Sequence, residues 1–129
     1  MKVLLDTPIL LWLVSDPTRV AAQALTVLAA PEAHLWATAA SAWEISIKTR
    51  LGRLDGEPLL SAWTDILTSM RVSELPIDAG DAILAGRLSW GHKDPFDRAI
   101  VAQALRRNLT IATRDTNIID AGLTPILTA

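Results

Sequence analysis

The chain has 129 residues, half of them hydrophobic, and it carries a formal net charge of −2 at pH 7. This length and composition predict one domain, over residues 1–129, with a buried core. The absence of cysteine excludes a disulfide framework and a thiolate metal site, and with no signal peptide in view we expect a cytoplasmic protein. No apolar run reaches membrane-spanning length without a charge, so we expect no membrane association.

Short apolar runs, which predict strands, alternate along the chain with segments that predict helices. Pro8 suits a first helical turn, whereas Pro31 and Gly52 end the helices before them. In chain order we expect strand 3–5, a helix from 8 to about 14, helix 20–30, strand 34–38, helix 41–51, helix 58–70, strand 72–76, helix 78–88, helix 94–107, strand 109–113, a turn or short helix around 118, and an edge strand at 125–127.

The expected strands read as continuous apolar runs, which are typical of a parallel sheet covered by helices on both faces. The sequence therefore predicts an α/β fold with a central parallel sheet of four or five strands. In such sheets ligands bind beyond the carboxyl ends of the strands. Asp6 follows the first strand directly and Asp115 follows strand 109–113 by two residues, so we expect both carboxylates at this edge.

Four acidic residues are placed where such a fold gathers its strand ends: Asp6, Glu44, Asp97 and Asp115. Carboxylates that meet in one cleft repel each other strongly unless a hard divalent cation lies between them. This pattern points to Mg²⁺ or Mn²⁺ and from there to phosphodiester chemistry. Glu44 is the most informative of the four, because it lies in a mostly apolar helical segment where a carboxylate needs a partner.

Each acid also has a structural interpretation. Asp6 can cap the helix that follows it, and Asp94 with Asp97 can form a capping box at the start of helix 94–107. Glu44 can pair with Lys48 one helical turn later. These roles are compatible with a metal site, because a helix N-terminus can also hold a metal-bound carboxylate in place.

Tryptophans and basic residues are harder to assign. We expect Trp12, Trp36, Trp43 and Trp63 in the core and Trp90 partly exposed.

Eight further acids, Asp81 among them, are expected in turns, at caps or on the solvent face. A set of basic residues close in sequence to the acids forms either solvated surface or a rim that holds phosphates: Lys48, Arg50, Arg53, His92, Lys93, Arg98 and Arg114.

Five blocks of sequence, in order and over essentially the whole chain, resemble the PIN-domain family and, within it, the VapC-type ribonuclease toxins of bacterial toxin–antitoxin pairs. The blocks are Leu4-Leu-Asp-Thr7, Ser41-Ala-Trp-Glu-Ile-Ser-Ile-Lys48, Leu51-Gly-Arg-Leu54, His92-Lys-Asp-Pro-Phe-Asp-Arg98 and Ala112-Thr-Arg-Asp115.

The resemblance implies a three-layer α/β/α fold and a metal-dependent endoribonuclease. It gives the catalytic and metal-binding positions to Asp6, Glu44, Asp97 and Asp115. Residues expected to support these acids or to bind substrate are Thr7, Lys48, Asp94, Arg98 and Thr113. The implied partners are an RNA substrate, a VapB-type antitoxin whose C-terminal segment lies near the acids, and a second copy of the chain.

The chemistry of such a site predicts hydrolysis by a metal-activated water, which leaves a 5′-phosphate and a 3′-hydroxyl. Other classes fit less well, because a receiver domain needs adjacent acids after the first strand and a dehalogenase-like phosphatase needs Asp-x-Asp there, whereas this chain has Asp6-Thr7-Pro8. A housekeeping RNA-processing or DNA-directed nuclease of the same family and a non-catalytic, metal-free binding module remain as alternatives.

Overall fold

The structure, a computed structural model, describes residues 1–129. Its five strands form one parallel sheet in the order β3-β2-β1-β4-β5. This confirms the α/β fold expected from the apolar runs. The strands are β1 (Lys2–Leu5), β2 (His34–Thr38), β3 (Val72–Leu75), β4 (Thr110–Thr113) and β5 (Ile126–Thr128).

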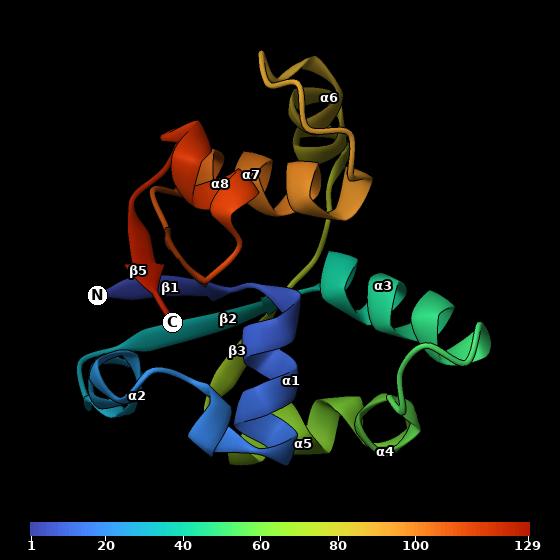
Figure 1. The fold of residues 1–129 in the computed structure, drawn as a ribbon, viewed down its shortest axis with the longest axis vertical. Helices are drawn as coiled ribbons and strands as arrows, with labels where there is room; N and C mark the ends of the chain where they lie inside the picture. Colours follow the sequence, from blue (N-terminus) through green and yellow to red (C-terminus); the bar gives the residue numbers. More distant parts are fainter.

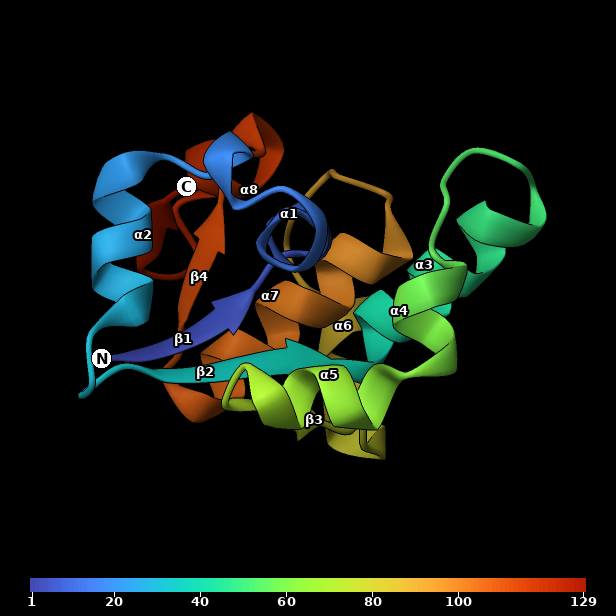
Figure 2. The ribbon, with the colours of Figure 1, turned by 90° about the horizontal axis from the view of Figure 1, so that it is seen from below.

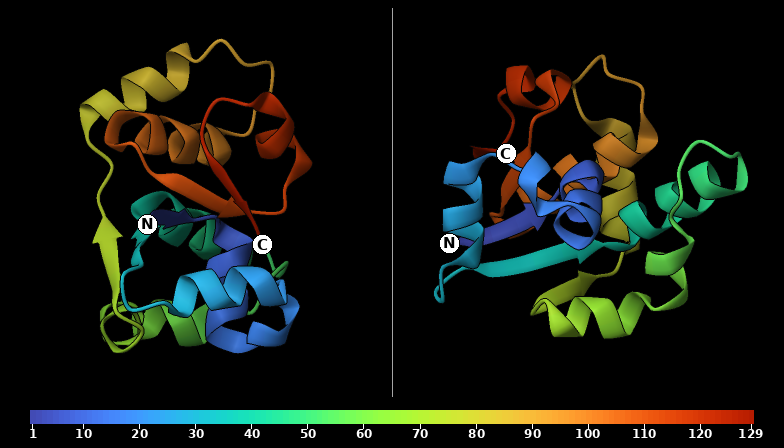
Figure 3. Two further views of the ribbon diagram at one scale, coloured as in Figure 1. Left: turned by 90° about the vertical axis from the view of Figure 1, so that its left-hand side faces the viewer. Right: turned by 60° about the horizontal axis from the view of Figure 1, so that its bottom comes forward.

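Helices cover both faces of the sheet. Figure 1 shows α1, α2, α4 and α5 on one side, α6, α7 and α8 on the other, and α3 running outward from the end of β2. Two further views of the ribbon (Figure 3) show the same layers. The helices are α1 (Thr7–Ser15), the 3₁₀ turn η1 (Pro17–Arg19), α2 (Ala22–Ala29), α3 (Ala39–Arg50), α4 (Glu57–Ser61), α5 (Trp63–Ser69), α6 (Ala79–Arg87), α7 (Pro95–Arg107) and α8 (Thr116–Ala121). None of them combines the length and apolar character needed to cross a bilayer.

Two hydrophobic clusters, one on each face of the sheet, hold these layers together. The side chains of β1 divide between them because successive residues of a strand point to opposite faces. Val3 and Leu5 belong to the larger cluster, together with buried residues of α1 to α5. Leu4 belongs to the smaller one, together with Ile100 of α7 and Ile118 of α8. β1 is thus the centre of both cores.

The register of the sheet brings three strand ends level. Leu5 pairs with Ala37 of β2 on one side and with Ala112 of β4 on the other. The strand order reverses at β1, which makes its carboxyl end the switch point where open parallel sheets bind ligands. In Figure 2 the arrows of β1 and β2 point toward α1 and α3, which begin at this edge.

One expected helix, 58–70, is wrong as a single element. The chain leaves helical geometry at Ala62, where φ is −128° and ψ is 28°, and α4 and α5 form on either side. The break lets Leu59 and Leu67 enter the same core cluster, while Trp63 donates to Glu74 of β3. Neither glycine nor proline occurs within 59–70, so the sequence carries no local signal for this break.

A polar cluster joins α6 to α7. Asp81 is fully buried and pairs with Arg106 at 2.5 Å and with Arg107 at 2.8 Å. It also shares a capping box with Asp78 and accepts a hydrogen bond from Gln103. Burial alone would raise the pKa of Asp81, but the hydrogen bonds from Arg107 and Arg106 hold it well below its usual range. Asp81 is thus a cap residue, as expected, but a buried one, because α7 supplies its partners.

Candidate active site at the carboxyl edge of the sheet

Asp6 is fixed by contacts to both neighbouring elements. It caps α1 by accepting a hydrogen bond from the Thr7 backbone N–H at 2.9 Å. Its other oxygen accepts a hydrogen bond from the Thr113 hydroxyl at 2.6 Å, across β1 and β4. The residue is 3% exposed. Both donors are neutral, and no basic side chain forms an ion pair with Asp6.

Asp115 and Asp6 share the Thr113 hydroxyl. The Asp115 backbone N–H donates to Thr113 Oγ1 at 3.0 Å, while that hydroxyl donates its own hydrogen to Asp6. The Asp115 side chain caps α8 by accepting a hydrogen bond from the Asn117 N–H. Thr113 therefore orients one carboxylate oxygen of Asp6 and the backbone of Asp115.

Glu44 is buried on α3 and points into the structure rather than to solvent. Its carboxylate accepts a hydrogen bond from Lys48 Nζ at 2.6 Å, and this bond raises the pKa of Lys48. The expected i,i+4 pair thus forms. Thr7, expected near the acids, exchanges a hydrogen bond of 2.8 Å with Ser41, which ties the start of α1 to α3.

The start of α7 departs from the expected capping box. Asp94 is the N-cap, and its carboxylate accepts hydrogen bonds from the N–H groups of Phe96 and Asp97. The Asp97 side chain does not return to the Asp94 backbone. It lies 2.7 Å from Nε2 of His92. Sequence reasoning placed His92 only among the basic residues near the acids, and the spacing of five residues to Asp97 was the available signal.

Electrostatics indicate that the four acids share one site. Burial raises the pKa of Asp6 to about 6, against a hydrogen bond from Thr113, and the charges of Asp115 and Glu44 add to the rise. Burial likewise raises the pKa of Asp97 to about 6, against the hydrogen bond from His92, and Asp94, Asp6 and Asp115 add to it. The charge of Asp6 is thus coupled to those of Glu44, Asp97 and Asp115, which come from other elements.

The donor set suits a hard divalent cation. Carboxylate oxygens dominate it, and such ligands favour Mg²⁺ and Mn²⁺. His92, Asp94 and Asp97 each offer one ligand atom, and these atoms all lie within 4.8 Å of one another. Each of the two aspartates has one oxygen engaged, Asp94 by the N–H groups of the α7 cap and Asp97 by His92. Asp97 is the better candidate for a direct ligand, because the charges of Asp6 and Asp115 act on it.

Arg98 organises the loop that carries His92. Its guanidinium donates to the carbonyl oxygens of Ala85, Leu88, Trp90 and His92, over 2.6 to 2.9 Å. These bonds occupy most of the N–H groups of Arg98. Arg98 therefore supports the site by holding the loop at 88–92 in place, and it forms no ion pair with the carboxylates.

One tryptophan prediction is wrong. Trp43 is 59% exposed, because the buried face of α3 is formed by Ser41, Glu44 and Ile45. Its ring meets the edge of Phe96 at a centroid distance of 5.1 Å. Trp90 is half-buried as expected and packs against the ring of His92.

Comparison with known proteins agrees with the fold. Residues 3–122 match the family model of the PIN domain, and the chain therefore belongs to the PIN domain family. Comparison with curated protein sequences gives no significant match.

Three solved structures illustrate the shared fold. VapBC2 from Rickettsia felis bound to a promoter DNA fragment aligns with a TM-score of 0.71 at 16% identity, over 98% of both chains. VapBC-1 from nontypeable Haemophilus influenzae gives 0.69 at 18% identity, over 98% of this chain and 97% of that chain. A toxin–antitoxin complex from Klebsiella pneumoniae gives 0.68 at 24% identity, over 98% and 96%. At these identities the likeness establishes the fold.

Proposed function

We propose that this protein is a metal-dependent endoribonuclease that acts as the toxin of a toxin–antitoxin pair. One observation carries the proposal: Asp6, Glu44, Asp97 and Asp115 arrive from four separate elements at the switch point of the sheet, and no arginine pairs with any of them. Asp6, Glu44 and Asp97 are buried. Burying carboxylates costs stability, and a bound cation would offset that cost.

These four carboxylates would hold Mg²⁺ or Mn²⁺. When bound, such a cation supplies a water nucleophile at neutral pH and stabilises the charge on the phosphate oxygens. The other residues of the site orient the carboxylates. Thr113 directs one oxygen of Asp6, and Lys48 holds one oxygen of Glu44.

His92 and Asp94 both form hydrogen bonds with Asp97. His92 holds one carboxylate oxygen by its hydrogen bond, and Asp94 fixes the backbone N–H of the same residue. Both contacts limit the rotamers open to Asp97, so a ligand oxygen is oriented before a cation arrives.

The geometry favours products with a 5′-phosphate and a 3′-hydroxyl. A route through a 2′,3′-cyclic phosphate needs two groups that exchange protons with the ribose and the leaving oxygen. The two histidines do not form such a pair, because His34 begins β2 and bonds to Ser73, whereas His92 lies beside Asp97 at the opposite edge.

The partners follow from the structural neighbours, which are themselves described as toxin–antitoxin complexes. We infer a VapB-type antitoxin that covers the carboxylate edge, and a homodimer. Two exposed apolar side chains support a protein-binding surface. Trp43 on α3 and Ile83 on α6 are each more than half exposed.

The test compares RNA cleavage by the isolated wild type with that by Asp97→Asn, in Mg²⁺, in Mn²⁺ and in EDTA, with product ends read by mass spectrometry. We expect metal-dependent cuts with 5′-phosphate ends and a loss of roughly a hundredfold or more in the variant. Asp65→Asn is the matched control, because it makes the same change on an exposed position of α5.

Other outcomes separate the alternatives. Cleavage of DNA in preference to RNA would indicate a DNA-directed nuclease. Absence of cleavage together with calorimetry that detects no divalent binding by wild type or by Glu44→Gln would indicate a metal-free binding module. A cyclic phosphate at the product end would contradict the hydrolytic route.

A further inference from the structure

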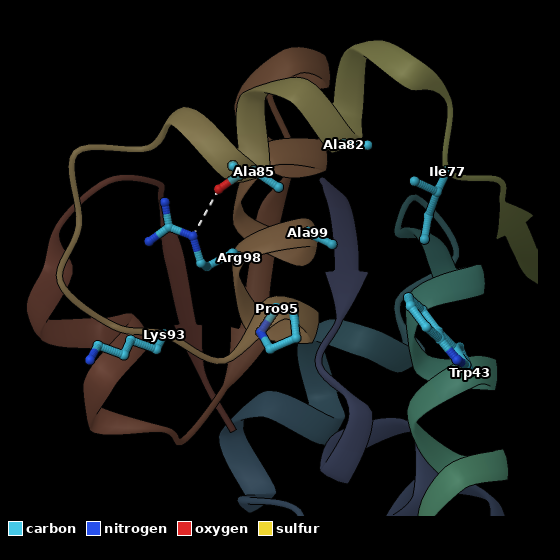
Figure 4. A pocket seen from close by; sticks show the side chains of 9 residues that line it. Trp43, Ile77, Ala82, Ala85, Lys93, Pro95, Arg98 and Ala99 are labelled. Atoms are coloured by element: carbon cyan, nitrogen blue, oxygen red, sulfur yellow. Dashed lines mark hydrogen bonds between the residues drawn. The ribbon is translucent and has the colours of Figure 1, made fainter.

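A hollow of about 300 Å³ lies between α3, α6 and α7, and two of its lining residues, Trp43 and Arg98, are sequence neighbours of Glu44 and Asp97. Figure 4 shows Trp43 of α3 across from Pro95 and Ala99 of α7, with Ile77 and Ala82 near its upper end. The volume exceeds that of a single water many times over. The walls are apolar, so a ligand there is held by its faces and not by hydrogen bonds.

Trp43 is the main aromatic wall of this hollow, and it is exposed. An indole that is 59% exposed leaves a large apolar face in water. Its ring packs at right angles to that of Phe96, which limits its motion. An exposed aromatic ring held in this way can stack on a flat ligand, and every nucleobase has a flat face.

The hollow is lined by residues of α3 and α7, and the same two helices carry Glu44 and Asp97. Trp43 directly precedes Glu44, and Phe96 directly precedes Asp97. Since successive helical residues point about 100° apart, the aromatic pair and the carboxylate pair occupy different faces of the same two helices. A strand that places a phosphate at the carboxylates and continues over α3 would meet Trp43.

The charges around the hollow suit an anionic strand. Its only charged lining residues are Lys93 and Arg98, both basic, and no acid contributes to its walls. Arg98 is engaged with the loop carbonyls. Lys93 is exposed, and Figure 4 shows its amine pointing away from the hollow, at the rim where a phosphate would pass.

We propose that this hollow receives an unpaired base of the RNA substrate, stacked on Trp43, while an adjoining phosphate lies at the carboxylates. The proposal rests on the ribonuclease function proposed above. It makes single-stranded RNA the substrate class, because a base held in a helix is not free to enter. Apolar walls give stacking without base-specific hydrogen bonds, so the hollow selects for an unpaired base and not for one sequence.

The test measures binding of a fluorescein-labelled decamer of uridines by fluorescence anisotropy in Mg²⁺. Asp97→Asn is the common background, so that the strand stays intact. A second decamer of the same length and charge carries abasic residues at five positions. We expect Trp43→Ala to weaken uridine-decamer binding by roughly tenfold, and Trp43→Phe by much less, because phenylalanine still stacks. Leu105→Ala, a change at an exposed apolar residue of α7 outside the hollow, is the control.

The abasic strand gives the decisive comparison. We expect the Trp43-containing protein to prefer the uridine decamer to the abasic one, and Trp43→Ala to bind both alike. An equal preference in both proteins would overturn the proposal. So would a Trp43→Ala protein that binds RNA normally but sediments as a smaller species than the parent, since the surface would then be an interface between copies.

Cleavage separates this inference from the function on which it rests. If otherwise native Trp43→Ala cuts RNA with an unchanged KM, the base-binding inference fails and the ribonuclease stands. If the wild type neither binds nor cuts any RNA, both fail together.

Discussion

Asp6 has two roles that conflict energetically. As an N-cap it begins α1, and its hydrogen bonds to Thr7 and Thr113 join β1 to β4. As a buried carboxylate among other carboxylates it resists ionisation, with a pKa raised to about 6 from 3.8. In the absence of a cation the residue therefore stabilises the fold through its geometry and destabilises it through its charge.

The raised pKa of Asp6 predicts that the free energy of unfolding depends on pH. The unfolded chain releases the Asp6 proton near pH 4, whereas the folded chain holds it until about pH 6. The stability associated with this proton is complete below pH 4 and is lost as the pH rises to about 6. Two pKa units correspond to about 3 kcal/mol at most. In EDTA at pH 8 we expect Asp6→Asn to raise the free energy of unfolding by about 1–3 kcal/mol.

Urea unfolding in EDTA at pH 4, 6 and 8 tests this. The variant and the wild type should agree at pH 4 and diverge by pH 8, because asparagine retains the cap without the charge. Adding Mg²⁺ at pH 8 should stabilise the wild type and leave Asp6→Asn nearly unchanged. A variant that is less stable than the wild type at pH 8 would show that the charge of Asp6 is not costly.

Single residues also show where sequence reasoning stops. Asp6 and Asp115 follow strand ends and precede helices, so their position was readable from local pattern. His92 and Trp43 were not readable in this way. The role of His92 depends on a loop whose path is set by Arg98, and the exposure of Trp43 depends on which face of α3 the rest of the chain covers.

At the scale of elements, α6 and α7 are joined by a buried charge. Asp81 is fully buried, whereas its neighbour Asp78 has a side chain that is 56% exposed, although both pair with Arg106. Removing the partner of a buried charge costs far more than removing an exposed one. The two aspartates are therefore a matched pair for measuring what holds α6 in place.

We expect Asp81→Asn to lower the free energy of unfolding by about 2 kcal/mol or more. Asp78→Asn should cost less than about 1 kcal/mol, because asparagine caps a helix as well as aspartate does. Denaturant titration at pH 7 measures both. Equal losses in the two variants would mean that burial of Asp81 adds nothing to the joint between α6 and α7.

Elements were predicted more reliably than their breaks. All five strands and the apolar pattern of the main helices followed from local sequence, because parallel strands and buried helix faces each leave a distinct pattern. The break between α4 and α5 left none. It arises from Leu59 and Leu67 entering one core, which is a tertiary requirement and not a local preference.

The whole molecule presents exposed apolar residues on α3 and α6. We expect a homodimer of the 13.9 kDa chain in solution at micromolar concentration. Sedimentation velocity, run with and without Mg²⁺, measures this directly. A stable monomer across that concentration range would count against the dimer, and it would leave the apolar surface to the antitoxin or to RNA.

The candidate site could be predicted as a set of acids but not as an arrangement. Strand ends predict that Asp6 and Asp115 lie at one edge of the sheet, whereas the places of Glu44 and Asp97 rest on the family resemblance. The sequence does not indicate that Thr113 serves both Asp6 and Asp115, nor that Asp97 turns to His92 and away from its own cap. Those contacts exist only after distant segments have packed.

The hydrogen bond between Thr113 and Asp6 joins positions 107 residues apart. β4 is made late in synthesis, so a growing chain that already holds Asp6, Glu44 and Asp97 has nothing to complete their cluster. A nascent or truncated chain that ends before β4 lacks both Thr113, which holds Asp6, and Asp115. Order of synthesis thus sets when the acidic cluster can form, because Thr113 and Asp115 are made after its other members.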